Sequence, residues 1–233
     1  SVLRGKKSGE YYYSKDGALL QEHLYEYADT DHGTTPFAAV TAGCRYEGRF
    51  LYYYGDVTKV TLKTYGPDGT VSTKISSYAY DSNRQLKRES VTDSDGKTYS
   101  KYRFYINSIY PPVRTPAENA MFSRSILAFP IYESEALTDA DGTRLTAAKH
   151  YVYIQAGPSF VLHKVEEANI PDAYSYGETV PVNLDYRTVR DFGGASGYNS
   201  FLRPCFETDR NGIQSIMIWS NEGLWPLALV RNC

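Results

Sequence analysis

Apolar or aromatic residues alternate with polar residues along much of the chain, with the two-residue period of a half-exposed β-strand. The segments 10–27 (EYYYSKDGALLQEHLYEY) and 49–80 (RFLYYYGDVTKVTLKTYGPDGTVSTKISSYAY) carry this pattern, and turn-forming residues interrupt both at short intervals. The alternation is incomplete in 57–65, where Val60 and Leu62 fall out of phase, as expected when neither face of a sheet is deeply buried. The pattern predicts antiparallel strands with at least one face in water.

Asp-Gly and Asn-Gly pairs separate these runs of alternating residues. Such pairs suit tight hairpins, because a type I′ turn requires positive φ at both central positions and these residues tolerate it best. Their recurrence, each time between strand-like segments, predicts a series of β-hairpins. The pairs are Asp16-Gly17, Asp68-Gly69, Asp95-Gly96, Asp141-Gly142 and Asn211-Gly212.

Two segments have apolar residues near helical spacing, 117–129 (AENAMFSRSILAF) and 17–28 (GALLQEHLYEYA). Pro116 suits the first helical position before the former segment, whereas Ser123 and Ser125 weaken it. We therefore expect an all-β chain of consecutive antiparallel hairpins with at most one short helix.

Proline and glycine mark the expected boundaries. The segment 110–116 (YPPVRTP) holds three prolines, which remove ladder donors and fix φ, so a central strand cannot pass through it. This predicts an N-terminal region, 1–112, and a C-terminal region, 113–233, which could also form one continuous domain. The glycine-rich segment 191–200 (DFGGASGYNS) predicts a long loop.

The charge balance gives little attraction for nucleic acid, because 25 basic and 27 acidic residues leave a net charge of −2. Tyrosine is unusually frequent, at 23 of 233 residues, and suits a half-buried pleated surface. The functional alternative is an aromatic platform for sugars, with Trp219, Trp225 and the tyrosine runs at 11–13 and 52–54 as candidates.

Metal and redox motifs are weak. Cys44, Cys205 and Cys233 lie far apart without a CxxC pair, so they indicate neither a zinc site nor a redox motif, and we expect free thiols. No apolar run approaches the roughly 18 residues needed to cross a bilayer, so no transmembrane segment is expected.

Two acidic stretches, VTDSDGK at 91–97 and LTDADGT at 137–143, share an Asp-x-Asp-Gly pattern that begins several calcium loops. Neither supplies the later glutamate of an EF-hand, so we interpret their aspartates as hairpin-turn residues and keep calcium as the alternative. These aspartates are Asp93, Asp95, Asp139 and Asp141.

Other candidate chemistry is also better explained by turns. The segment YADTDHGTT places Asp29, Asp31 and His32 together, but no HExxH or HxH motif occurs. The segment GASG (194–197) lacks the strand-to-helix context and the spacing of a nucleophile elbow. We predict no catalytic residue and no cofactor.

The segment YAYDSNRQLKRESVTDSDGK (78–97) resembles the YD repeat of Rhs-type proteins. Tyr80-Asp81 supplies the pair that names the repeat, 83–86 (NRQL) replaces the usual Gly-Arg-Leu, and Asp95-Gly96 ends the unit. The physical logic carries over, because Asp81 can bond to the backbone two residues on and Asn83 tolerates the left-handed conformation.

The segment 206–232 (FETDRNGIQSIMIWSNEGLWPLALVRN) is similar to the terminal segment of divergent YD-repeat proteins of Gram-negative gut bacteria. An Asn-Gly turn, a strand with Trp219, a small turn and a "WPLALV" strand occupy the family's places, while 113–200 departs from the pattern. The resemblance implies an extended, curled sheet of hairpins in an exported protein, in the periplasm or at the cell surface, and implies no catalytic residues.

These observations predict a non-catalytic structural or binding module of a surface or secreted protein. Open sheet edges would allow a protein partner, or self-association, by strand addition. The alternative is a protein that binds or acts on polysaccharide through exposed aromatics and carboxylates.

Overall fold

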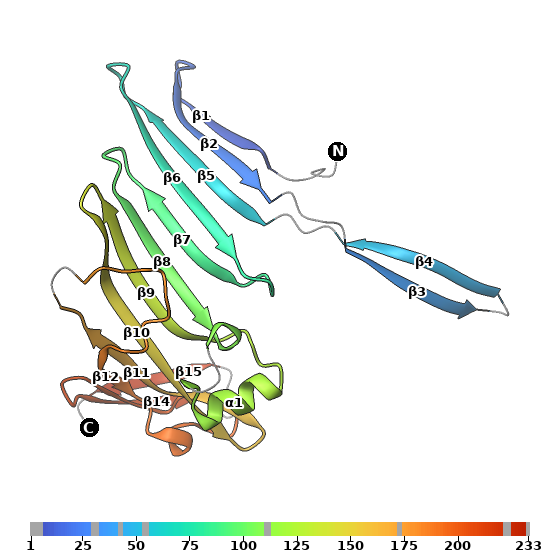
Figure 1. Cartoon of the computed structure of the whole chain (residues 1–233), viewed down its shortest axis with the longest axis vertical. Coiled ribbons are helices and arrows are strands. Elements are labelled where there is room, and N and C mark those ends of the chain that lie inside the picture. The colour runs from blue at the N-terminus through green and yellow to red at the C-terminus, as the bar shows by residue number, and fades with distance from the viewer. Residues whose placement is uncertain are drawn as a thin grey trace. The chain divides into compact units, whose positions relative to one another are not determined.

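Strands dominate the computed structural model, which describes residues 7–28, 33–41, 44–52, 56–109, 113–171, 174–220 and 225–231 (Figure 1). The chain forms two compact units, which we treat separately. Unit 1 contains Ser1–Ala79 and Glu89–Lys97, and unit 2 contains Tyr80–Arg88 and Thr98–Cys233. The predicted division at 112/113 stays a prediction, and the boundaries of the two units fall at 79/80, 88/89 and 97/98 along the chain.

Unit 1 is a small antiparallel meander. Its strands lie side by side in the order β1, β2, β5 and β6, and β3 and β4 pair with each other in a separate hairpin. Apart from Ser90, the residues of unit 1 whose burial is described are at most partly buried, so both faces of its meander contact water. The strands are β1 (Gly9–Tyr13), β2 (Leu19–Tyr27), β3 (Gly33–Thr41), β4 (Cys44–Tyr52), β5 (Val57–Tyr65), β6 (Val71–Tyr80) and β7 (Leu86–Thr92), which both units share.

In unit 2 each strand from β8 to β15 pairs antiparallel with the next along the chain. The strands are β8 (Thr98–Tyr105), β9 (Pro130–Asp139), β10 (Gly142–Ala156), β11 (Ser159–Asn169), β12 (Asp185–Asp191), β13 (Phe206–Asp209), β14 (Gln214–Trp219) and β15 (Pro226–Arg231). The helical pieces whose full bounds are described in this unit are η1 (Ile106–Ser108), α1 (Pro116–Ser123) and η3 (Gly194–Gly197). The prediction of an all-β chain of consecutive antiparallel hairpins is confirmed.

The short helix lies where the sequence allows one. Pro116 occupies its first turn, and Thr115 and Glu118 form a reciprocal capping box, in which each side chain bonds to the backbone N–H of the other. The second helical candidate, 17–28, was wrong, because it forms β2, which pairs with a strand on each side. Pairing on both edges outweighs its modest helical periodicity.

The hydrophobic core lies in unit 2, between β8–β10 and the segment that leads to β12. Backbone bonds Leu145 N to Tyr174 O and Tyr176 N to Thr143 O hold this segment beside β10 (Figure 1). Tyr176 packs edge-on against Tyr102, and Ile106, Met121 and Ile131 are fully enclosed. The buried cluster comprises Tyr102, Phe104, Ile106, Ile109, Met121, Ile131, Tyr132, Ala136, Leu145, Ala148, Tyr153 and Tyr176.

One loop geometry recurs in both units. The first residue of each loop accepts a backbone N–H bond three residues on and donates to the carbonyl four residues on, and the fourth residue has positive φ. These loops begin at Ser14, Gly66, Asp81, Asp93, Asn199 and Asp209. The positive-φ residues are Gly17, Gly69, Arg84, Gly96, Leu202 and Gly212.

This geometry corrects the predicted turn type. Among the described residues, positive φ falls on the glycine of each Asp-Gly or Asn-Gly pair and not on its Asp or Asn, so these are not type I′ turns. A three-residue loop with a left-handed glycine matches the recurring loop better. In the loop at Asp81 the left-handed residue is Arg84 (φ 64°) and not Asn83.

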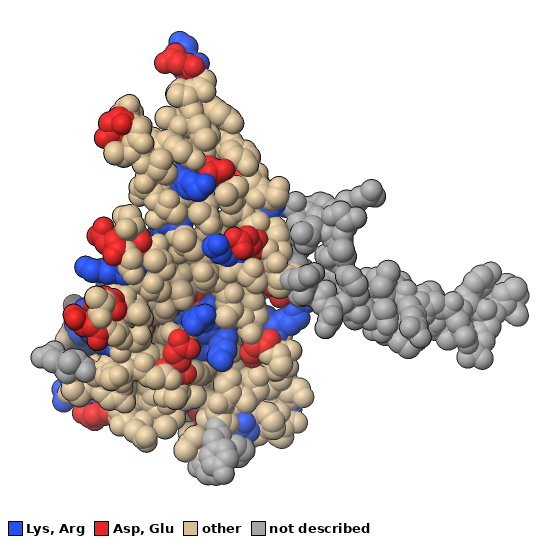
Figure 2. Space-filling model, turned by 45° about the horizontal axis from the view of Figure 1, so that its top comes forward, with Lys and Arg blue, Asp and Glu red and all other residues tan. Residues whose placement is uncertain are grey.

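Charged side chains are mixed on the surface. On the face in Figure 2, Lys and Arg lie among Asp and Glu, as the near-balanced composition suggests. Of the helices in the described ranges, none is both long and apolar enough to cross a membrane.

Candidate functional site

The hairpin of β14 with β15 in unit 2 carries several exposed apolar side chains. Ile216 pairs with Val230 and Ile218 with Ala228, which places these four side chains on one face. Met217 pairs with Leu229 on the other face. All six residues of β15 are exposed, so neither of its faces is covered by the described residues.

Among the described residues, nothing pairs with one side of the β15 backbone. Met217 N donates to Cys205 O, so the polar groups of Met217 point toward β13, and those of Ile216 and Ile218 point toward β15. By the same alternation, the N–H and C=O groups of Ala228 and Val230 point toward β14. The N–H and C=O groups of Leu229 point to the opposite side of β15, which we call the free side. Among the described residues, β15 pairs with β14 alone.

The exposed apolar surface at this edge is large. Leu229 is 54% exposed on one face, Ile216, Ile218 and Val230 are exposed on the other face, and Leu227 is 66% exposed. Leu227 is the extra residue where the register shifts between Ile218 and Trp219, and such a bulge commonly marks a sheet edge. An open edge with apolar side chains on both faces is a site for pairing with another strand.

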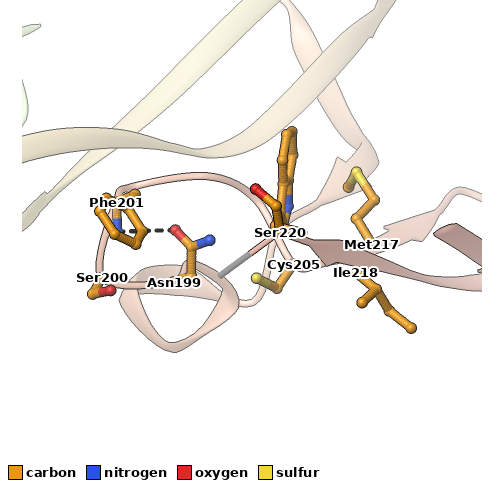
Figure 3. A pocket seen from close by; sticks show the side chains of 8 residues that line it. Asn199, Ser200, Phe201, Cys205, Met217, Ile218 and Ser220 are labelled. Carbon is orange, nitrogen blue, oxygen red and sulfur yellow. Dashed lines mark hydrogen bonds between the residues drawn. The ribbon is translucent and has the colours of Figure 1, made fainter. Parts of the chain in front are cut away.

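A hollow of about 380 Å³ lies beside this hairpin, where β14 ends (Figure 3). The Asn199 side chain fixes one wall, because its Oδ1 accepts N–H bonds from Phe201 and Arg203, each at 3.0 Å. Apolar side chains and small polar groups both line the hollow. The lining residues are Asn199, Ser200, Phe201, Cys205, Met217, Ile218, Trp219 and Ser220.

The two predicted tryptophans, Trp219 at the end of β14 and Trp225 directly before β15, differ in environment. Trp219 lines the hollow, its Nε1–H donates to Pro204 O at 2.7 Å, and the Arg203 guanidinium lies 6.0 Å from its ring. Trp225 is 70% exposed, and its carbonyl accepts the N–H of Ser220. The side chain of Trp219 is therefore held in place by its hydrogen bond, whereas the side chain of Trp225 is largely exposed to solvent.

The tyrosine run of β1 is exposed in unit 1. Tyr11, Tyr12 and Tyr13 are each about half exposed, and alternation places Tyr12 on the face opposite the other two. Tyr12 packs against His23 at 5.4 Å between ring centroids. The side chains of 52–54 lie outside the described residues.

The Asp-x-Asp aspartates lie in hairpin turns. Asp93 Oδ1 accepts the N–H groups of Asp95 and Lys97, each at 3.0 Å, and Asp139 Oδ1 accepts the N–H of Asp141. Within the described ranges, no group of three or more His, Cys, Asp or Glu side chains is placed to hold a metal ion. Calcium binding at these aspartates stays an untested alternative.

The other candidates have structural positions or lie outside the description. Cys205 is a free thiol in the wall of the hollow, whereas Cys233 and the side chain of Cys44 are not described. Asp29, Asp31 and His32 also lie outside the described residues.

The segment GASG forms η3, and its Gly197 lies against the carbonyl of Phe192, where a Cβ would clash. The Ser196 hydroxyl donates to Gly193 O. Both residues therefore serve the local fold.

Sequence reasoning missed a partly buried acidic and histidine cluster in unit 2. His150 Nδ1 lies 2.9 Å from Glu166 Oε2, and its Nε2 lies 3.8 Å from Glu118 Oε1. His150 stacks on Tyr132 at 4.4 Å between ring centroids. Burial and the two carboxylates raise the pKa of Tyr132 to about 12, so its hydroxyl stays protonated.

This cluster joins α1, β10 and β11, and Glu118 is its buried member. Glu118 is 2% exposed, so it is closed to solvent, and its other oxygen accepts the Thr115 N–H of the capping box. The Thr-x-x-Glu spacing of that box was a readable signal for Glu118. Nothing in the sequence could place His150 and Glu166 beside it, because β10 and β11, which pair these two residues with each other, come well after α1 along the chain.

Comparison with known proteins adds no family. No protein-family model matches this chain, and a search of curated proteins finds no match.

Proposed function

We propose that this chain is a non-catalytic structural or binding module of an exported protein, built from YD-repeat-like hairpins, that joins another chain by strand addition at β15. The observation that carries the proposal is β15 itself, a strand exposed on both faces with apolar residues on each. Backbone bonds along such an edge would supply affinity, and the alternate side chains would supply specificity.

The repeated loop geometry supports the scaffold part of the proposal. The loops at Asp81, Asp93 and Asp209 each use the Asp Oδ1 to accept N–H groups two and four residues on. One turn design used in succession suits a chain whose role is to extend a sheet. The segment 78–97, which resembles a YD repeat, contains two of these loops.

The proposal is tested by probing the free edge with strand peptides. Leu229→Pro removes an N–H that faces the free side and leaves the bonds to β14 intact, as proline permits on an edge strand. Leu229→Val is the matched control, because it keeps both the N–H and a strand-forming apolar side chain. We expect the wild type and Leu229→Val to bind immobilised hexapeptides with alternating apolar residues, and Leu229→Pro to lose that binding. Equal binding by all three proteins would contradict the proposal.

A second candidate, sugar binding, draws on the hollow at Trp219 and Phe201. A hollow of this volume with aromatic walls and small polar groups fits a sugar ring in size and chemistry. On a glycan array, a sugar site predicts a bound glycan whose signal falls at least about tenfold in Phe201→Ala, which corresponds to roughly 1.4 kcal/mol for one stacked ring. Phe129→Ala, which truncates another half-exposed ring of unit 2, is the control. Absence of any bound glycan would remove this candidate.

A further inference from the structure

The partner chemistry that best fits β15 is another apolar, uncharged strand. β14 reads QSIMIW and β15 reads PLALVR, so Arg231 is the single charged residue of the two strands. A partner strand with carboxylates or ammonium groups would place them beside the apolar side chains of Leu229 and Val230, where no opposite charge is available to pair with them. The strand that meets this requirement most directly is β15 of a second copy.

We propose that two copies of this chain associate through β15, in an antiparallel two-fold pairing centred on Leu229. This inference rests on the proposed strand addition and names its partner. In a two-fold pairing the same surface serves both copies, so each contact occurs twice. The N–H and C=O of Leu229 face the free side, so the two Leu229 residues form a directly opposed hydrogen-bonded pair.

The side chains agree with this register. Ala228 of one copy lies opposite Val230 of the other, which extends the apolar face already formed by Ile216 and Ile218. On the opposite face the two Leu229 side chains meet beside Met217. Both faces of the joined sheet are therefore continuous in apolar side chains across the axis.

Charge also agrees with this register. Arg231 of one copy falls opposite Leu227 of the other, at the two ends of the paired segment, where its guanidinium reaches water. The two arginines are therefore kept apart and do not oppose each other. A parallel pairing in register would instead align Arg231 with Arg231, which is destabilising.

The interface is short, which sets its strength. Its described part is a single six-residue strand from each copy with the neighbouring side chains of β14. Interfaces of that size belong to the weak, transient class. The association therefore depends on concentration and is best captured by a covalent trap.

Cysteine cross-linking tests the register directly. In a Cys44→Ser, Cys205→Ser, Cys233→Ser background, Leu229→Cys places two cysteines in an opposed pair with Cα atoms about 5.5 Å apart, within disulfide range. Leu227→Cys is the matched control, because the register separates its two copies by about 13 Å along the strands. We expect mild oxidation to double the mass of the Leu229→Cys protein and to leave the Leu227→Cys protein monomeric.

A second pair of variants guards against a local effect at Leu229. Ala228→Cys and Val230→Cys should cross-link when mixed, since they are opposed across the axis, and much less when each is oxidised alone. A monomeric Leu229→Cys protein together with an unlinked mixture would overturn the two-fold pairing, as would equal cross-linking at 227 and 229. If strand peptides still bind the edge in that case, strand addition stands and only the second copy is rejected.

Discussion

At the scale of single residues, the loops depend on one left-handed position and one side-chain acceptor. The glycine of each Asp-Gly pair was readable from the sequence, and the structure gives it the positive φ that these loops need. Arg84 and Leu202 occupy the same left-handed position in two other loops. Neither residue type favours positive φ, so the sequence does not indicate these positions. Their loops were less predictable because an acceptor at the first position, Asp81 or Asn199, fixes the turn without a glycine.

Replacing a left-handed glycine should cost backbone energy alone. At Gly212 an added Cβ meets nothing within 4 Å, but φ is 76°, so Gly212→Ala should lower the free energy of unfolding by about 1 kcal/mol. Gly177→Ala is the control, because Gly177 also has open space and no left-handed φ. Urea unfolding monitored by circular dichroism measures both. Equal losses in the two variants would contradict the backbone argument.

The loop acceptor should matter by its oxygen and not by its charge. Asp209 Oδ1 accepts the N–H groups of Asn211 and Ile213 at 2.8 and 3.0 Å. Asp209→Ala should therefore lower the free energy of unfolding by about 1 kcal/mol, as loss of a capping acceptor does elsewhere. Asp209→Asn keeps the acceptor and should retain most of the stability. Thermal melts in which Asp209→Asn lowers the melting temperature as much as Asp209→Ala would contradict this role.

At the scale of elements, Glu133 ties three strands of unit 2 together. On β9, it accepts bonds from the Tyr151 hydroxyl of β10 at 2.7 Å and from Arg103 of β8 at 3.2 Å, and Lys101 lies 3.1 Å away. Burial raises the pKa of this carboxyl, but the bonds from Tyr151 and Lys101 and the positive charges outweigh burial, so the pKa lies below its ordinary value.

A depressed carboxyl pKa makes stability depend on pH. The contribution of Glu133 is present above its unfolded-state pKa, near 4.5, and is lost as pH falls through the lower folded-state pKa. Glu133→Gln should lower the free energy of unfolding at pH 7 by about 2 kcal/mol and flatten its fall between pH 5 and about pH 3. Glu135→Gln, two residues away and 53% exposed, should leave the slope nearly unchanged. Urea unfolding across that pH range measures the effect. Equal pH dependence of the free energy of unfolding in the wild type and Glu133→Gln would contradict the stabilising role of the Glu133 carboxylate.

Strands were more predictable than their environments. The period-two pattern and the turn pairs indicated consecutive hairpins, because both signals are local. The helix predicted as a candidate over 17–28 was wrong, because the apolar spacing of this segment suits either a helix or a strand. Pairing with β1 and β5 determines that it forms a strand. The cluster of Glu118, His150 and Glu166 was beyond local reasoning, because it forms only when α1 packs on the sheet.

At the scale of the whole molecule, two tryptophans were the useful pointers to the candidate site. The sequence singled out Trp219 and Trp225 as aromatic, and the structure places both on the hairpin that carries β15. The sequence could not reveal that β15 is covered on neither face by the described residues, because WPLALV would read the same in a covered strand. Exposure depends on neighbouring strands, which local patterns do not specify.

The central claim is that the free side of β15 accepts a strand, and amide hydrogen exchange tests it most directly. The synthetic peptide WPLALVR, a copy of residues 225–231, is added to the folded protein, and exchange is followed at Leu229 and Val230. The account predicts that the Leu229 amide, which faces the free side, exchanges rapidly alone and slows as peptide is added, while the Val230 amide, already directed to β14, changes much less. Unchanged exchange at Leu229 at saturating peptide would contradict the account.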